Sequence, residues 1–235
     1  MNIGPIEIFY DGSNIEKYGV LPYVKGITTN CSIFSKSGYK SYADFFEKYQ
    51  DIFKEKPVSL QTWDDDSEKM IEQVKQIHSI HPSIYVKIPI VNTKGQYTEN
   101  VIQYAVENCI PINITILHTK EQVLKAYDLV KESRAPIIIS LFVGPVMDTF
   151  ADGEELIRFT VHLFKEKKNC KILFAGCREV YAIKRANDLG CHIITIPDVI
   201  LEKASLFHGD LQELTLARAR LFHKDASCGN FTILN

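Results

Sequence analysis

The chain has 235 residues, of which 46% are hydrophobic and 24% are charged, as is ordinary for one large or two small globular domains. Its formal net charge of −2 gives no electrostatic reason to bind nucleic acid or an acidic membrane surface. The first residues lack a basic region followed by an apolar core, and no apolar run approaches the roughly 18 residues of a membrane-spanning helix, so we expect a cytoplasmic protein without a signal peptide.

Eight short runs rich in apolar and β-branched residues recur along the chain. Most are too short for helices, and several are almost continuously apolar, which is typical of strands covered on both faces. The runs are residues 6–12, 26–30, 57–62, 84–90, 111–117, 135–142, 170–176 and 192–197.

Amphipathic segments separate the later runs and predict helices over residues 66–81, 119–133, 153–168 and 178–190. Thr119 with Gln122 resembles a capping box, and Gly190 is a helix stop. Two further helical segments, residues 196–207 and 210–226, follow the last predicted strand.

This alternation of strand and helix predicts a (β/α)8 TIM barrel that forms a single domain over residues 1–235. A doubly wound open sheet is the alternative, but the Gly-rich phosphate turn that usually follows its first strand is missing. The two last helical segments exceed a minimal barrel. The C-terminal helix, over about residues 209–225, is therefore a candidate for assembly, and its apolar residues could alternatively cover the chain's own barrel.

The six cysteines are scattered, with no Cys-x-x-Cys pair and no histidine at zinc-finger spacing. This pattern indicates free, buried thiols in a reducing cytoplasm. We expect the protein to bind no metal.

In a (β/α)8 barrel the active site lies at the C-terminal ends of the strands. The polar residues and the one aromatic residue at these ends are Asp11, Thr28, Thr29, Asn30, Gln61, Thr62, Lys87, Asn113, Thr115, Ser140, Phe142 and Arg178. Lys87 lies inside an otherwise apolar run, and burial would lower its pKa and free the amine to form a Schiff base. A carboxylate and a hydroxyl could then move protons, and Arg178 at a helix start suits a phosphate.

Structural explanations remain open for these residues. Lys87 could decorate an edge strand or form half of a salt bridge. Asp11 precedes a glycine, where aspartate is usually a turn or cap residue. Arg178 could pair with Glu179 or with a neighbouring helix.

Seven segments follow one another in the order and approximate spacing of one enzyme family. They are IFYDGSN, VKGITTNCS, VSLQT, YVKIPI, INITIL, SLFVG and FAGCREV. On these motifs the chain resembles the transaldolase and fructose-6-phosphate aldolase family over essentially its whole length. Its length resembles that of the short, single-barrel branch.

The resemblance implies a role for each matching residue. Lys87 would form the Schiff base, Asp11 would steer proton transfer, Thr115 would position the catalytic water, and Gln61 would be the matching third-strand residue. The residues that would bind substrate are Thr29, Asn30, Ser140, Phe142, Gly176 and Arg178, with the arginine on the phosphate.

Five positions depart from the pattern of the family. Cys31 replaces the usual proline, and Pro145 stands where an arginine is normal. Gln61 occurs in the aldolases, whereas transaldolases have a glutamate there, and Phe142 occurs in transaldolases, whereas the aldolases have a tyrosine. Gly176 replaces a serine that would help to hold the phosphate.

The resemblance implies a cofactor-free enzyme of carbohydrate metabolism, such as the pentose phosphate pathway. It would transfer a dihydroxyacetone unit from a ketose phosphate, or a related anionic sugar, to an aldose acceptor. Alternatives are a lyase that releases dihydroxyacetone, a specialised transaldolase for a modified sugar, and an inactive barrel that serves in binding or assembly. The short branch also implies a homo-oligomer such as a pentamer or decamer.

Overall fold

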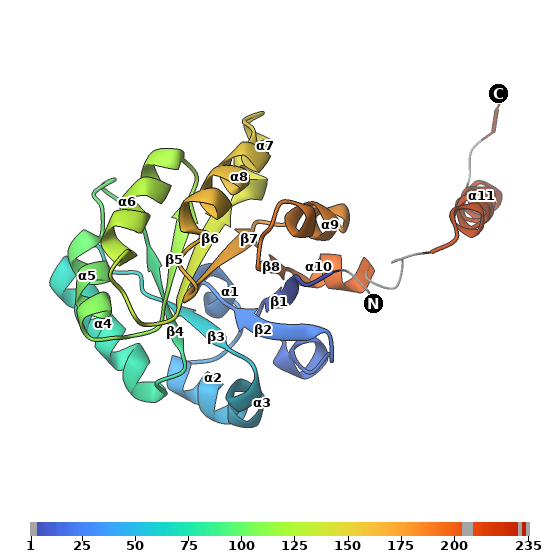
Figure 1. Ribbon diagram of the computed structural model, residues 1–235. Coiled ribbons are helices and arrows are strands. Elements are labelled where there is room, and N and C mark those ends of the chain that lie inside the picture. The colour runs from blue at the N-terminus through green and yellow to red at the C-terminus, as the bar shows by residue number, and fades with distance from the viewer. Residues whose placement is uncertain (1–3, 204–208, 230–231, 234–235) are drawn as a thin grey trace. The chain divides into compact units, whose positions relative to one another are not determined.

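A computed structural model describes residues 4–203, 209–229 and 232–233. The chain divides into two compact units, Met1–Leu201 and Glu202–Asn235. The first unit is a closed barrel of eight parallel strands in sequential order. The predicted (β/α)8 architecture is therefore confirmed (Figure 1).

Seven of the eight apolar runs contain one strand of the barrel, and the run over residues 26–30 overlaps β2, which begins two residues earlier. The strands are β1 (Glu7–Asp11), β2 (Val24–Thr28), β3 (Val58–Gln61), β4 (Tyr85–Pro89), β5 (Ile112–Leu117), β6 (Ile137–Phe142), β7 (Cys170–Ala175) and β8 (Ile193–Ile196). Closure of the barrel leaves no edge strand, so β4 is paired on both sides and Lys87 does not decorate an edge.

Helices cover the outside of the barrel in Figure 1. The longer ones are α4 (Ser67–Ile80), α5 (Glu99–Glu107), α6 (Lys120–Val130), α8 (Gly153–Phe164) and α9 (Tyr181–Asp188). The shorter ones are α1 (Cys31–Ser35), α2 (Tyr42–Lys48), α3 (Gln50–Glu55), α7 (Val143–Asp148) and α10 (Asp198–Leu201), together with a π-helical segment, Ile15–Gly19.

The predicted helix signals are present in the structure. Thr119 and Gln122 form both hydrogen bonds of a capping box at the start of α6. Gly190 follows α9 with a φ of 85°, a backbone conformation that glycine adopts without steric cost. The helices α1, α2, α3, α5 and α7 were not predicted; α2 and α3 are short and are separated at Tyr49.

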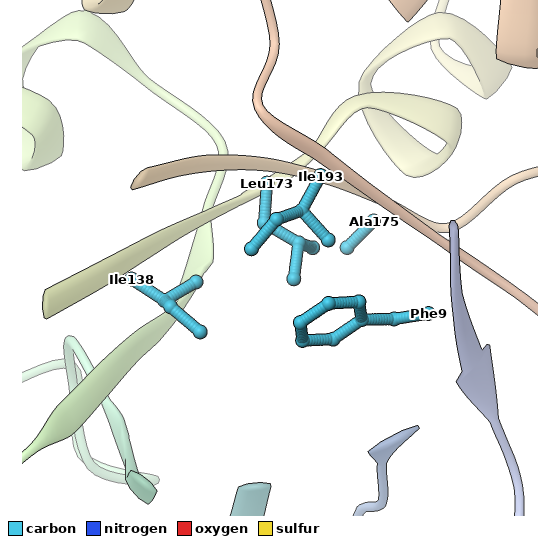
Figure 2. Packing of buried hydrophobic residues seen from close by; sticks show 5 residues of the cluster. All are labelled: Phe9, Ile138, Leu173, Ala175 and Ile193. Carbon is cyan, nitrogen blue, oxygen red and sulfur yellow. The ribbon is translucent and has the colours of Figure 1, made fainter. Parts of the chain in front are cut away.

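An apolar cluster fills the barrel interior. Its members are Phe9, Ile138, Leu173, Ala175 and Ile193, with Tyr85 and Phe142 packed against them (Figure 2). Gly26 makes room for the Phe9 ring, because a Cβ at this glycine would lie 2.4 Å from Phe9 Cζ. Side chains two residues further along a strand point to the same face. Asp11 and Lys87 therefore follow Phe9 and Tyr85 into the barrel, one layer nearer its C-terminal end.

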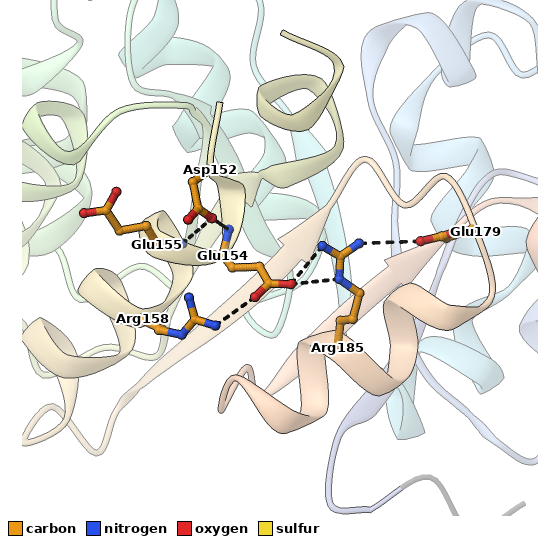
Figure 3. A network of polar contacts seen from close by, with 6 residues as sticks. All are labelled: Asp152, Glu154, Glu155, Arg158, Glu179 and Arg185. Carbon is orange, nitrogen blue, oxygen red and sulfur yellow. Dashed lines mark hydrogen bonds and ion pairs between the residues drawn. The ribbon is translucent and has the colours of Figure 1, made fainter. Parts of the chain in front are cut away.

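An ion-pair network joins α8 to α9 (Figure 3). The Arg185 guanidinium lies 2.8 Å from Glu154 and 3.5 Å from Glu179, and Arg158 binds the same Glu154 carboxylate. Asp152 caps α8 by accepting from two backbone N–H groups. Glu179 pairs with Arg185, and Arg178 pairs with Asp148 of α7, so the alternative of a pair with a neighbouring helix is confirmed and the Arg178–Glu179 pair is not formed.

The second unit contains the helix α11 (Leu211–Cys228), which Asp210 caps at its N-terminus. The expected C-terminal helix is therefore present. Of the helix predicted over residues 196–207, α10 covers the start, and residues 204–208 lie outside the described part of the chain. Among the described residues no helix is both long enough and apolar enough to cross a membrane.

Candidate active site

Lys87 is the only lysine whose side chain the described barrel buries in its interior. It is 5% exposed, and its Nζ donates a hydrogen bond to the carbonyl oxygen of Thr29 at 3.0 Å. Burial lowers the pKa of Lys87, while the charges of Asp11 and Cys31 act in the opposite direction. No salt bridge to Lys87 is present among the described residues, so the ion-pair explanation does not account for its burial.

Asp11 is fixed at the end of β1 by two threonines. The Thr28 hydroxyl donates to Asp11 Oδ1 at 2.7 Å and lies 2.6 Å from the hydroxyl of Thr195 in β8. The Thr28 hydroxyl has one proton, which it gives to Asp11, so the Thr195 hydroxyl donates to Thr28. These two hydrogen bonds hold the Asp11 carboxylate toward the barrel interior, where its negative charge raises the pKa of Lys87.

A second chain of hydrogen bonds crosses the barrel from β3 to β6. The Ser140 hydroxyl donates to Asn113 Oδ1 at 2.6 Å, and the Asn113 amide donates to the Ser59 hydroxyl at 3.1 Å. All three side chains are buried. Buried polar side chains with hydrogen-bond partners keep fixed positions. The Ser140 hydroxyl oxygen can therefore accept a further hydrogen bond from one defined direction.

Thr115 differs from the other buried hydroxyls. It is fully buried, and its Oγ1 has no hydrogen-bond partner among the described residues. The next residue, Ile116, has a φ of 60°, and the pairing of β5 with β6 shifts register at this point. A β-branched residue in this conformation is strained by about 1–3 kcal/mol. A strained strand beside an unpaired buried hydroxyl is typical of a site that receives a ligand or a water.

Asn30 lies between β2 and α1 and lines a cavity of about 540 Å³ together with Asp11. Its side-chain oxygen caps α1 by accepting from the Ile33 N–H at 2.9 Å. The cap leaves the amide NH2 group as the part of Asn30 that can donate to a substrate. Asp198, at the start of α10, lines the same cavity as Tyr10.

Thr29 and Gln61 lie beside Lys87, and Phe142 lies at the end of β6. The Thr29 hydroxyl donates to the Ser59 carbonyl at 3.1 Å, so Thr29 meets the lysine through its backbone. Gln61 is the register partner of Lys87 in the neighbouring strand. Phe142 ends β6 against the apolar cluster, with its ring centroid 5.4 Å from that of His118.

Arg178 lies apart from this group. Its side chain is 61% exposed and pairs with Asp148 of α7 at 2.8 Å. Gly176 has a φ of 74°, and a Cβ there would lie 2.5 Å from the Cδ of Pro145. Gly176, which stands where the family pattern has a serine, therefore lies against Pro145, which stands where it has an arginine.

Thr195, Tyr42 and Asp198 were not among the site residues predicted from the sequence. Thr195 had a detectable signal, because it is the one hydroxyl residue within the apolar run of β8. Asp198 also had a signal, because it lies two residues beyond the end of β8, whereas Tyr42 had none, since only the folded chain brings α2 to the end of β3.

Comparison with known protein sequences identifies the family of this chain. The family model for transaldolase/fructose-6-phosphate aldolase matches residues 8–230. A probable transaldolase of Thermoanaerobacter sp. (strain X514) is 30% identical over 203 residues, which cover 83% of this chain and 88% of the relative. A probable transaldolase of Syntrophobacter fumaroxidans is 28% identical over 219 residues, covering 91% of this chain and 94% of the relative.

Solved structures with a similar fold are more distant in sequence. A mandelate oxidase variant has a TM-score of 0.52 at 13% identity and covers 74% of this chain and 56% of its own. A candidate phosphonomutase from Burkholderia cenocepacia J2315 has a TM-score of 0.53 at 10% identity, covering 89% of this chain and 93% of its own. These likenesses concern the barrel alone, whereas the family match extends over nearly the whole sequence. The chain belongs to the transaldolase/fructose-6-phosphate aldolase family.

Proposed function

We propose that this enzyme forms a Schiff base on Lys87 and transfers a dihydroxyacetone unit from a ketose to an aldose acceptor. The observation that carries the proposal is the buried amine of Lys87 at the C-terminal end of the barrel. Its pKa is lowered by burial, which favours the neutral form that attacks a carbonyl.

The neighbours of Lys87 fit the remaining steps of this reaction. Asp11 would accept a proton from the hydroxyl whose carbon–carbon bond breaks, since its carboxylate faces the barrel interior. Asn30 and Ser140 would hold the bound dihydroxyacetone unit, and Thr115 would bind the water that hydrolyses the imine through its unpaired hydroxyl.

Two residues favour transfer to an acceptor over release of free dihydroxyacetone. Gln61 and Phe142 both lack a titratable proton, and Phe142 packs on an apolar cluster. The three-carbon intermediate therefore has no strong acid from these positions to protonate and release it. A lyase that releases dihydroxyacetone is the second candidate, and it predicts product without an acceptor.

We further propose that the sugar carries a phosphate or a related anion, which Arg178 binds. The Arg178–Asp148 pair is exposed on both sides, at 61% and 56%. Exposed ion pairs contribute about 0–1 kcal/mol. A phosphate that accepts two parallel hydrogen bonds from the guanidinium can therefore displace Asp148.

The proposal is tested by incubation with fructose 6-phosphate, with and without an aldose phosphate acceptor. Product that forms only with the acceptor supports transfer, and product that forms equally without it contradicts transfer and supports the lyase. Lys87→Met should abolish both reactions. Lys171→Met is the matched control, because Lys171 is also a strand lysine but pairs with Glu7 near the opposite end of the barrel.

We also propose that α11 serves in a homo-oligomer. It exposes Leu211, Leu214, Leu221 and Phe222, and no residue of this helix is buried. A single helix cannot bury its own apolar side chains, so subunit packing is a natural use for them. A chain truncated before Gly209 should contain fewer subunits than the full chain in sedimentation equilibrium, and an unchanged number of subunits would contradict this proposal.

A further inference from the structure

A thiol and a phenol lie beside Lys87. Cys31 is the first residue of α1, two positions after Thr29, whose carbonyl accepts the hydrogen bond of the Lys87 amine. Tyr42 of α2 donates from its hydroxyl to the carbonyl of Gln61 at 2.9 Å, and Gln61 is the register partner of Lys87. Both residues belong to the connection between β2 and β3, which contacts Lys87 through the Thr29 carbonyl and the last residue of β3 through the Tyr42 hydroxyl.

Both side chains line one cavity and act on each other's pKa. The Tyr42 hydroxyl donates its one proton to the Gln61 carbonyl, and turning this proton toward the sulfur would stabilise the thiolate and lower the pKa of Cys31. Burial raises the pKa of Cys31 and lowers the pKa of Lys87. The charge of Lys87 acts to lower the pKa of Cys31, and the charge of Cys31 acts to raise the pKa of Lys87, but burial is the larger effect on both groups. These two pKa shifts favour a protonated thiol and a neutral amine. A protonated thiol can act as an acid, and a neutral amine can act as a nucleophile.

A cavity of about 320 Å³ gives access to this pair. Cys31, Phe34, Tyr42 and Trp63 line it. The Tyr42 ring is held between the other two rings, with centroid distances of 4.5 Å to Phe34 and 6.1 Å to Trp63. The phenol is thus positioned by packing, and small molecules can reach the half-buried thiol from the cavity.

We propose that Cys31 is the acid–base residue of imine formation on Lys87 and that Tyr42 positions it. This inference rests on the proposed Schiff-base function. Cys31 acts in imine formation, a step that Gln61 and Phe142 cannot assist because neither has a titratable proton.

The proposed step conserves protons and electrons. The Lys87 nitrogen forms a bond to the ketose carbonyl carbon, and one of its protons moves to the carbonyl oxygen, which gives a carbinolamine. The carbon–oxygen bond then breaks, the oxygen leaves as water with the proton of the Cys31 thiol, and the nitrogen lone pair forms the carbon–nitrogen double bond. The products are water, a protonated imine and a thiolate.

The surroundings stabilise this thiolate. It faces the positive charge of the protonated imine, and Tyr42 can turn its proton from the Gln61 carbonyl to the sulfur. Hydrolysis reverses the step, because the water that adds to the imine carbon returns a proton to the thiolate.

The test is the rate at which borohydride-trappable imine forms in a single turnover with fructose 6-phosphate. We expect Cys31→Ala to slow imine formation about 10²-fold, the usual contribution of a positioned acid. Cys31→Ser should be similarly slow, because an alcohol holds its proton more tightly than a thiol. Tyr42→Phe should slow the reaction by less than about tenfold, since it removes hydrogen bonds but keeps the ring.

Two further measurements separate an acid from a structural residue. Imidazole should restore the rate of Cys31→Ala in proportion to its concentration, because it can enter the cavity and donate a proton. Cys31→Pro should fold normally and form the imine as slowly as Cys31→Ala, since proline is favoured at the first position of a helix. Cys228→Ala is the control, an exposed thiol in α11 whose loss should leave the rate unchanged.

The outcomes distinguish this inference from the proposed function. Imine formation by Cys31→Ala at the unaltered rate would overturn the role of Cys31 and leave the Schiff-base function intact. A slow Cys31→Ala variant that imidazole does not accelerate would also overturn it. An unaltered protein that forms no imine on Lys87 would overturn both proposals.

Discussion

The contact between Gly176 and Pro145 makes a quantitative stability prediction. Gly176 has a φ of 74°, and a Cβ added there would lie 2.5 Å from Pro145 Cδ, well inside ordinary van der Waals contact. The left-handed backbone costs a residue with a Cβ about 1–2 kcal/mol, and overpacking costs about 1–3 kcal/mol. We therefore expect Gly176→Ala to lower the free energy of unfolding by about 2–5 kcal/mol.

The two contributions can be measured separately. Gly95 has a φ of 75°, and a Cβ added there would meet nothing within 4 Å, so Gly95→Ala should show the backbone cost alone. Adding Pro145→Ala to Gly176→Ala should remove the overlap and recover about 1–3 kcal/mol. Urea denaturation of these three variants, of Pro145→Ala alone and of the unaltered protein gives these values. A Gly176→Ala variant no less stable than Gly95→Ala, or a double variant without recovery, would refute the steric explanation.

Two predictions concern the charge state of Lys87. Asp11→Asn removes a charge that raises the pKa of Lys87, so imine trapping should persist to lower pH than in the unaltered protein; an unchanged or higher midpoint would contradict this. Lys87→Met should change how stability depends on pH. Between the lowered pKa of folded Lys87 and the unfolded value of about 10.4, the unfolded chain binds more protons, so the stability of the unaltered protein gains from rising pH. The variant lacks this gain, and its free energy of unfolding relative to the unaltered protein should fall as pH rises toward about 10.4; a constant difference in urea melts would count against a depressed pKa.

The barrel was predictable from sequence because its strands are covered on both faces. Such strands are continuous runs of β-branched residues, which few helices resemble. Lys87 could be identified for the same reason, since one charge in an apolar run stands out. The loop regions between β2 and β3 were not predictable in this way, because α2 and α3 are short and bury only Phe45, Phe46 and Phe53.

Other parts of the site depend on contacts between distant residues. The strained φ of Ile116 and the unpaired hydroxyl of Thr115 arise from the register shift between β5 and β6. The pairing of Arg178 with Asp148 arises from the approach of α7 to the end of β7. Neither the register shift nor the Arg178–Asp148 pair could be predicted, because neither leaves a local pattern in the sequence.

The central claim is that Lys87 carries the covalent chemistry. The most direct measurement is borohydride trapping with fructose 6-phosphate, followed by mass spectrometry of the peptide that contains Lys87. We predict a reduced three-carbon adduct on Lys87 in the unaltered protein and in Lys171→Met, and no adduct in Lys87→Met. No adduct with any ketose or ketose phosphate, or an adduct that persists in Lys87→Met, would contradict the account.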